Sequence, residues 1–368
     1  TQTPDESMGV HFAITDTEGH TAQVKVPRAA VTTDCPATAA RAWNVGNGEA
    51  FPARGAVYLK CLLMGQEILP AYEDTAALEA ILDDGDEVLM QAPYFTPYPQ
   101  QVELARGIPI ELPTYEEEDF QINVERLESL ITERTKAILI CNPNNPTGYL
   151  YSRAEMNQIR DLVMKYDLYL FSDEVYREFI YTGSPYISAL NLDGIENNVV
   201  LVDSVSKRYS ECGIRIGALV TRNADVRRAV MKFCQARLSP PLLGQIVAEE
   251  SIEGTEEYAA DVYEEYVERR KCLVDGLNRI EGVYSPIPMG AFYTVASLPV
   301  DDADKFCEWC LSDFNYEGET VMMAPASGFY STPGMGRNEV RIAYVLKKED
   351  LQRALFILEK ALEAYNKR

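Results

Sequence analysis

A lysine follows closely on an apolar run that has the composition of a buried strand. The run is NVVLV, residues 198–202, and the next stretch, from Ser204 to Gly217, reads SVSKRYSECGIRIG. Ligands of open α/β sheets bind in the crevice outside the carboxyl ends of the strands, which is where we expect Lys207 to emerge. Its amine there either reaches out to water or takes part in chemistry.

Polar side chains follow two other apolar runs in the same way. They are Asn145 after KAILIC (136–141), Asp173 and Tyr176 after LYLFS (168–172), and, in the stretch above, Ser204 and Arg215. Each has an ordinary interpretation by itself, as a turn, a helix cap, a core aromatic or a surface charge. Their joint occurrence at strand ends predicts that they converge on one site.

The order of the predicted elements is that of an α/β fold. Strands are predicted at 87–92, 108–112, 136–141, 168–172, 198–202 and 216–220. Helices are predicted at 124–133, after a capping box of Ser152 and Glu155, at about 255–277 and at about 348–364. Such alternation predicts a mostly parallel sheet with helices on both faces.

Composition narrows the range of partners. The chain has 368 residues, of which 46% are hydrophobic, and this suffices for a substantial core and about two domains. Its formal charge of -23 argues against a nucleic-acid partner, because nucleic acids are bound by basic surfaces. Because no apolar run approaches the ~18 residues of a membrane span, we expect no membrane partner and a cytoplasmic location.

The residue inventory gives little support to metal or thiol chemistry. The only histidines are His11 and His20, which excludes a histidine-based triad or zinc site elsewhere in the chain. The eight cysteines are scattered, as is usual for free thiols in a reducing compartment. Cys307 and Cys310 form a CEWC pair inside a helical pattern, which favours a structural role, and we expect no metal site.

An amine, a carboxylate, a phenol, an amide and an arginine together suit a Schiff base to an aldehyde cofactor, pyridoxal 5′-phosphate. The motifs NPNNPTG, SDEVY and SVSK followed by GIRIG resemble those of the pyridoxal phosphate-dependent class I/II aminotransferases, in the fold-type I, aspartate aminotransferase group. The resemblance runs from about Asp83 to the C-terminus. It implies a large cofactor-binding domain, 54–277, and a smaller α+β domain, 278–368, to which residues 1–53 are a candidate addition.

The resemblance also implies a role for each residue of the site. Lys207 resembles the Schiff-base lysine that also moves a proton, and Asp173 the partner of the pyridinium nitrogen. The others resemble donors to the ring oxygen (Tyr176, Asn145), an aromatic stacked on the ring (Phe95), phosphate contacts (Ser204, Arg215) and, in GRNEVRIAYV, the arginine that binds the substrate α-carboxylate (Arg341) with Asn145 beside it. PMGAFY, residues 288–293, resembles the family segment that enters the small domain.

The implied reaction moves an amino group between an L-amino acid and a 2-oxo acid such as 2-oxoglutarate, in a homodimer with its site at the interface. Aspartate or another dicarboxylic amino acid is the expected donor, and its side chain needs a second cation, for which Arg208 and Arg237 are candidates. Two alternatives remain open: a β-eliminating lyase of the same fold, and a non-catalytic regulator built on it.

The first 82 residues depart from the family pattern. The family has a Gly-rich helix start about 16 residues before its GDE motif, where backbone N–H groups bind phosphate. At that distance from Gly85 this chain has LPAYED. The one suggestive string is WNVGNGEAFP with Gly46, and Tyr58 and Tyr72 are the first tyrosines available to reach a neighbouring subunit's phosphate.

Overall fold

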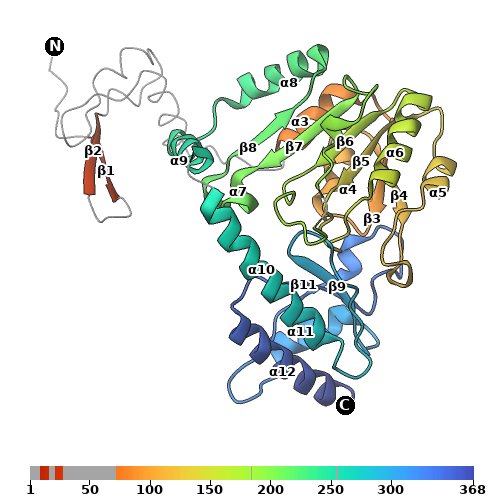
Figure 1. Ribbon diagram of the computed structural model, residues 1–368, viewed down its shortest axis with the longest axis vertical. Helices are drawn as coiled ribbons and strands as arrows, with labels where there is room; N and C mark the ends of the chain where they lie inside the picture. Colours follow the sequence, from red (N-terminus) through yellow and green to blue (C-terminus); the bar gives the residue numbers. More distant parts are fainter. Residues whose placement is uncertain (1–8, 16–20, 28–71, 184, 254–255) are drawn as a thin grey trace.

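The structure, a computed structural model, describes residues 9–15, 21–27, 72–183, 185–253 and 256–368. Its largest element is a six-stranded sheet with the strand order β4-β3-β5-β6-β7-β8. The strands are β3 (Glu87–Ala92), β4 (Ile108–Pro113), β5 (Thr135–Cys141), β6 (Tyr169–Asp173), β7 (Val199–Ser204) and β8 (Gly217–Val220). All neighbours are parallel except β7 and β8. The predicted mostly parallel sheet is therefore confirmed (Figure 1).

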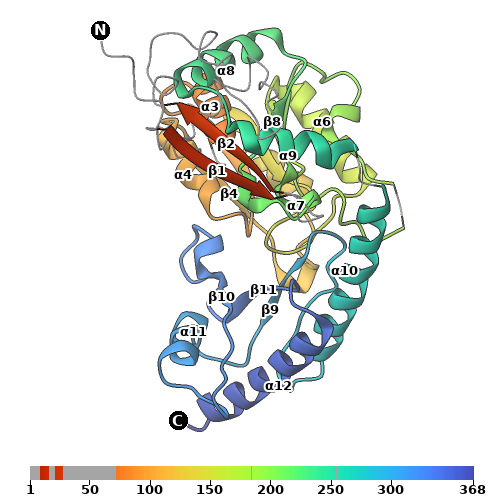
Figure 2. The same ribbon diagram turned by 90° about the vertical axis from the view of Figure 1, so that its left-hand side faces the viewer.

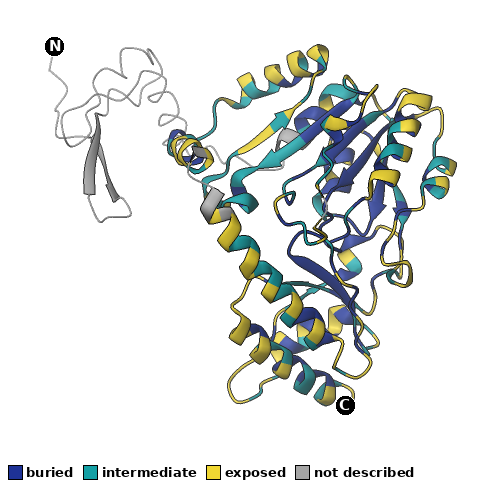
Figure 3. Ribbon diagram, in the orientation of Figure 1, coloured by how far each residue is buried: buried dark blue, intermediate teal, exposed yellow. Residues whose placement is uncertain are grey.

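The central strands β3, β5 and β6 are largely apolar because both faces of the sheet are covered there. Successive side chains of a strand point to opposite faces. Ile138 and Ile140 of β5 accordingly pack into one core cluster, and Ala137 and Leu139 into another. Figure 3 shows the central strands as the most deeply buried part of the chain. The continuous apolar runs in the sequence are typical of such doubly covered strands.

The helices flank the sheet or connect it to the rest of the chain. They are α3 (Tyr72–Ile81), α4 (Pro97–Leu104), α5 (Val124–Ser129), α6 (Arg153–Tyr166), α7 (Val205–Arg208), α8 (Ala224–Arg237), α9 (Leu242–Glu253), α10 (Glu256–Leu277), α11 (Ala303–Ser312) and α12 (Lys348–Tyr365). The predicted capping box opens α6: the Ser152 N–H donates to Glu155 at 2.7 Å, and the Glu155 N–H donates to the Ser152 hydroxyl. Within the described ranges, none of the helices combines the length and apolar character needed to cross a lipid bilayer.

Helix α5 ends at Ser129, four residues before the end of the predicted helix. The Ser129 hydroxyl donates to the backbone oxygen of Arg126 at 2.7 Å. The Thr132 N–H then donates to the Thr135 hydroxyl at 2.9 Å, which turns the chain into β5. Side chains that hydrogen-bond to nearby backbone groups in this way compete with the helix ladder.

A three-stranded sheet, β10-β11-β9, lies below the six-stranded sheet in Figure 1. Its antiparallel strands are β9 (Tyr293–Ser297), β10 (Ala324–Pro325) and β11 (Glu339–Ala343). Helices α10 and α12 pack against each other (Figure 2), and at Gly276 a Cβ atom would lie 2.3 Å from the Leu355 side chain. Helix α10 ends at Leu277, the last residue of the predicted large domain. The division into 54–277 and 278–368 itself stays a prediction.

The first described residues form an antiparallel hairpin that was not predicted from the sequence. It consists of β1 (Gly9–Thr15) and β2 (Thr21–Pro27). The string 43–52 with its Gly46, and Tyr58, lie outside the described residues. Tyr72, the other tyrosine of that prediction, is the first residue of α3.

Candidate active site

The three predicted segments leave the same edge of the sheet. β5 and β6 are in register with Cys141 opposite Asp173, so both strands end together. The Asn142 N–H donates to the backbone oxygen of Asp173 at 2.9 Å, and the Glu174 N–H donates to that of Val202 at 2.9 Å. Polar residues that follow β5, β6 and β7 are therefore brought to one place, as the strand-end rule predicts.

Asp173 is a partly buried carboxylate at the last position of β6. Its Oδ1 accepts from the Val175 N–H at 3.1 Å, and its Oδ2 accepts from the Tyr98 hydroxyl. Burial raises the pKa of Asp173, whereas the hydrogen bond from Tyr98 and the charge of Lys207 lower it. A carboxylate removed from water in this way is stabilised by a cationic N–H partner, and a pyridinium nitrogen meets that requirement.

Asn145, Tyr176 and Arg341 form a hydrogen-bonded line. The Asn145 Nδ2 donates to the Tyr176 hydroxyl at 3.4 Å, and the Arg341 Nη1 donates to the Asn145 Oδ1 at 3.0 Å. The Tyr176 hydroxyl in turn donates to the Tyr293 hydroxyl at 3.3 Å. Asn145 is thereby the link between residues predicted to hold the cofactor and the residue predicted to hold the substrate.

Arg341 is fixed in the middle of β11. It pairs with Val295 of β9 on one side and with Ala324 of β10 on the other. Its guanidinium lies 4.7 Å from the ring centroid of Tyr293 and 5.0 Å from that of Phe329, close enough for cation–π attraction. Such contacts hold the fork of an arginine in one orientation, as recognition of a carboxylate requires.

The NPNNPTG loop keeps its shape through local hydrogen bonds and one glycine. The Asn144 Oδ1 accepts from the Thr147 N–H at 3.1 Å and from the Thr147 hydroxyl at 2.9 Å. Gly148 has a φ of +71°, and a Cβ atom there would lie 2.4 Å from Pro288. The loop thus packs directly on PMGAFY, where the Gly290 N–H donates to the Gly148 oxygen at 2.9 Å.

Lys207 lies in the short helix α7, which Ser204 caps. The Ser204 hydroxyl accepts from the Ser206 N–H at 3.0 Å and donates to the backbone oxygen of Ile216 at 3.0 Å. The Lys207 amine lies 3.8 Å from the Cys212 sulfur. This lysine therefore emerges one turn beyond β7, in the predicted position.

Arg215 and Phe95 each contact residues close to them in the chain. The guanidinium of Arg215, which follows the turn Cys212–Ile214, donates to the backbone oxygen of Cys212 and is held by its own loop. Phe95 packs edge-on against Tyr98 with ring centroids 5.5 Å apart. Their predicted roles at the phosphate and the ring stay predictions.

Arg208 and Arg237 are the candidate partners for a carboxylate on the substrate side chain. Arg208 is already paired, through its Nη2 with Asp203 at 2.9 Å and through its Nε with Glu178 at 3.2 Å. Two acidic partners therefore already share the charge of Arg208, and its role as the second cation stays a prediction. Arg237 is the last residue of α8, and its role stays a prediction.

Tyr98 and Tyr293, which hydrogen-bond to Asp173 and Tyr176, were not among the site residues predicted from the sequence. Tyr98 lies three residues after Phe95, where its backbone N–H donates to the Phe95 oxygen at 3.0 Å, and that spacing could have pointed to it. Cys307 and Cys310 lie buried on α11, as the helical pattern predicted, and burial raises their thiol pKa values to about 11 and about 12. A thiol with so high a pKa is a poor nucleophile.

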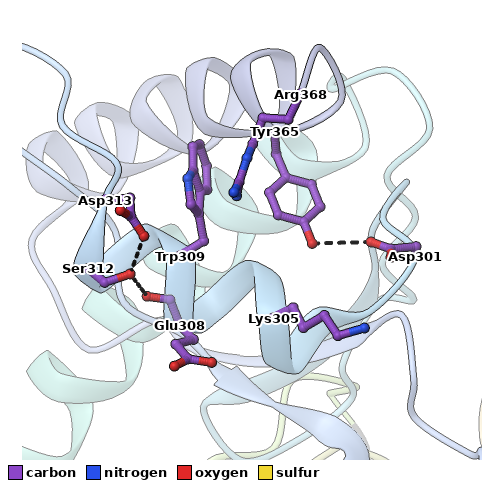
Figure 4. A pocket seen from close by; sticks show the side chains of 8 residues that line it. All are labelled: Asp301, Lys305, Glu308, Trp309, Ser312, Asp313, Tyr365 and Arg368. Carbon is purple, nitrogen blue, oxygen red and sulfur yellow. Dashed lines mark hydrogen bonds between the residues drawn. The ribbon is translucent and has the colours of Figure 1, made fainter.

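A cavity of about 450 Å³ lies elsewhere, between α11 and the end of α12 (Figure 4). Its side chains bond among themselves: the Tyr365 hydroxyl donates to Asp301 at 3.1 Å, and the Ser312 hydroxyl donates to Asp313 at 2.6 Å. The guanidinium of Arg368 lies 5.2 Å from the Trp309 ring. None of the predicted site residues lines this cavity.

Comparison with known proteins supports the reading of these motifs. The family described as "Aminotransferase class I and II" matches residues 73–358. The aspartate aminotransferase of Pyrococcus abyssi is 33% identical over 289 residues, 77% of this chain and 72% of that protein. The probable aspartate/prephenate aminotransferase of Aquifex aeolicus is 32% identical over 287 residues, again 77% and 72%.

Solved structures agree in fold. The aromatic aminotransferase of Pyrococcus horikoshii superposes with a TM-score of 0.73 at 31% identity, covering 81% of this chain and 78% of that one. The aspartate aminotransferase of Thermus thermophilus with maleate gives a TM-score of 0.71 at 29% identity, covering 79% and 74%.

Proposed function

The chain belongs to the class I and II aminotransferases, a family of pyridoxal phosphate-dependent enzymes, and from this premise we propose which cofactor, substrate and residues it uses. It binds pyridoxal 5′-phosphate at the carboxyl ends of β5, β6 and β7, and it transfers the amino group of aspartate or another dicarboxylic amino acid to a 2-oxo acid such as 2-oxoglutarate. The observation that carries the proposal is the hydrogen-bonded line of Arg341, Asn145 and Tyr176 beside Asp173.

The cofactor, when bound, supplies an aldehyde for an amine and a ring that accepts electrons. The carboxylate of Asp173 holds a proton on the ring nitrogen, because its buried charge is stabilised by that N–H. Tyr176 and Asn145 donate hydrogen bonds to the ring oxygen. Their side chains fit that role, because the pKa of Tyr176 is raised by burial and its hydroxyl keeps its proton.

Lys207 and Arg341 act on the substrate. The Lys207 amine, near the end of the short helix α7 and close enough to Asp173 for its charge to lower the pKa of that carboxyl, carries a proton to and from the substrate α-carbon. The guanidinium of Arg341 binds the α-carboxylate, with its orientation fixed by Asn145 and by two aromatic rings. Ser204 and Arg215 bind the phosphate, and Phe95 stacks on the ring.

Aspartate is the first donor to test, because several similar proteins are named aspartate aminotransferases. Aromatic amino acids are a second candidate. Two observations favour them: the rings of Tyr293 and Phe329 surround Arg341, and the similar Pyrococcus horikoshii protein is an aromatic aminotransferase. Asp203 and Glu178 also neutralise part of the charge of Arg208, which weakens its attraction for a second carboxylate.

The absorption spectrum of the protein with pyridoxal phosphate tests the proposal. We expect a visible band that changes on addition of L-aspartate, returns with 2-oxoglutarate, and is missing in Lys207→Ala. L-Phenylalanine in place of L-aspartate decides between the two donor classes. Release of pyruvate and ammonia without a 2-oxo acid acceptor would identify a lyase, and wild-type protein without a cofactor band would refute the cofactor assignment.

We also propose a homodimer in the cytoplasm, on the family resemblance and the composition. Support for an interface comes from exposed apolar side chains on α9, namely Ile246, Val247 and Ile252. Exposed large apolar side chains that are not scattered singly are typical of contact with another chain. Sedimentation analysis tests the proposal, and a monomer at micromolar concentration would contradict it.

A further inference from the structure

The carboxylate of Glu111 accepts hydrogen bonds from a loop that belongs to the other sheet. Glu111 lies on β4, the edge strand of the six-stranded sheet. Its Oε2 accepts from the Ser331 N–H at 2.5 Å, and its Oε1 accepts from the Thr332 N–H at 3.1 Å and the Thr332 hydroxyl at 2.5 Å. The bound loop precedes β11. Hydrogen bonds to an ionised acceptor are about twice as strong as neutral ones.

Tyr94 also takes part in this contact between β4 and the loop. Its hydroxyl donates to the Glu111 Oε2 at 3.0 Å and shares a hydrogen bond with the Ser331 hydroxyl. Its backbone N–H donates to the backbone oxygen of Phe329 at 3.1 Å. Burial raises the pKa of Tyr94, so the hydroxyl keeps its proton and remains a donor. The next residue along the chain is Phe95, the predicted ring-stacking aromatic.

The loop held by Glu111 is the one that supports Arg341. The loop runs from residue 329 to residue 332, and the ring of Phe329, its first residue, lies against the Arg341 guanidinium. The Tyr330 hydroxyl donates to Glu339 at 2.8 Å, and Glu339 lies on β11 two residues before Arg341, on the same face of the strand. A change at Glu111 therefore reaches Arg341 through both Phe329 and β11.

We propose that Glu111 and Tyr94 form a latch that fixes the loop 329–332 and thereby holds Arg341 ready for the substrate carboxylate. The inference rests on the proposed function, because it takes Arg341 as the carboxylate-binding residue. Glu111 is a positioning residue and does not touch the substrate. When the latch is closed, the side chain that binds the carboxylate needs no further ordering, which favours affinity. When it is open, Phe329 no longer restrains the guanidinium.

Kinetics of Glu111→Gln, Glu111→Asp and Tyr94→Phe test the latch, with Glu103→Gln, at an exposed position of α4, as the matched control. In Glu111→Gln an amide N–H replaces an acceptor that faces the Ser331 and Thr332 donors. We expect the KM for the amino donor to rise about tenfold while kcat per cofactor-loaded site stays within about threefold. Glu111→Asp keeps the charge and restores most of the affinity, and the control leaves both constants unchanged.

Amide hydrogen exchange at Ser331 and Thr332 provides a second readout that needs no activity. Loss of the Glu111 acceptor should raise exchange at both amides about tenfold or more, and should leave the control variant like the wild type. The latch is overturned if the wild type is active and Glu111→Gln shows the same KM and the same exchange rates at both amides as the wild type. A variant that loses only thermal stability and kcat also overturns it, since that result indicates a structural role. If the wild type shows no amino transfer with any donor, the proposed function fails, and faster exchange alone would still establish the closed loop contact.

Discussion

Removal of the Tyr98 hydroxyl isolates the hydrogen bond that Asp173 receives from α4. Tyr98 is 2% exposed, so Tyr98→Phe keeps the packing of the ring and deletes one donor to Asp173. A hydrogen bond to a charged group contributes roughly 1.5–3 kcal/mol. The hydrogen bond stabilises the Asp173 carboxylate that supports a protonated ring nitrogen. Its loss should therefore lower kcat/KM about 10- to 100-fold.

The pH profile gives this prediction a direction. The hydrogen bond from Tyr98 lowers the pKa of Asp173 against the opposite effect of burial, so its loss raises that pKa. A higher pKa leaves more Asp173 protonated at a given acidic pH, and the acid side of the kcat/KM profile should move to higher pH. Steady-state rates measured across pH, together with the absorbance of the bound cofactor, follow both changes.

The matched control is Tyr166→Phe, because the Tyr166 hydroxyl donates to Glu128 on the surface, away from the strand ends. It should leave both the rate and the pH profile unchanged. The reasoning would be refuted by a Tyr98→Phe enzyme that keeps kcat/KM within about twofold of the wild type with its acid limb in place.

Three further substitutions probe other parts of the structure. Arg341→Lys keeps the charge but loses the fork that binds a carboxylate, so KM should rise about 10- to 100-fold with a smaller change in kcat, measured by steady-state kinetics. Glu116 has its pKa raised from 4.5 to about 7 by burial, so the folded state retains a proton that the unfolded state loses, and stability falls as pH rises from 4.5 to 7. Thermal unfolding of Glu116→Gln should therefore match the wild type near pH 4.5 and exceed it at pH 8, by an amount on the order of 1 kcal/mol after screening by water, and equal melting at both pH values would contradict this. Gly148→Ala places a Cβ against Pro288 at a positive φ, which should cost about 1–3 kcal/mol in chemical denaturation and reduce activity by moving Asn145; unchanged stability would show that the loop can relax.

The sheet could be predicted from sequence because its strands are continuous apolar runs. The predicted strand 87–92 has the bounds of β3, and the predicted 136–141 differs from β5 by one residue. Their central residues are buried on both faces, so apolar side chains predominate there. The end of α5 could not be predicted in the same way, because a serine side chain and a turn decide it.

Contacts between segments far apart in the chain could not be predicted from the sequence. The Glu111 and Ser331 pair is separated by 220 residues, and nothing in either local sequence indicates the other. The pairing of Arg208 with Asp203 and Glu178 likewise depends on how α7 packs beside β7. Motifs placed Asn145, Asp173 and Arg341 correctly at strand ends or in a strand, but the hydrogen bond from Arg341 to Asn145 required the folded chain.

The amide of Asn145 has a thermodynamic consequence. It donates to Tyr176 with one end and accepts from Arg341 with the other, so a ligand that orients either neighbour also orients the amide. Two binding equilibria that share one group are linked, and the linkage is reciprocal: whatever factor the first ligand adds to the affinity for the second, the second adds to the affinity for the first. An aspartate in place of Asn145 could accept from Arg341 but could not donate to Tyr176, so the link between the two sites would require the Tyr176 hydroxyl to turn and become the donor.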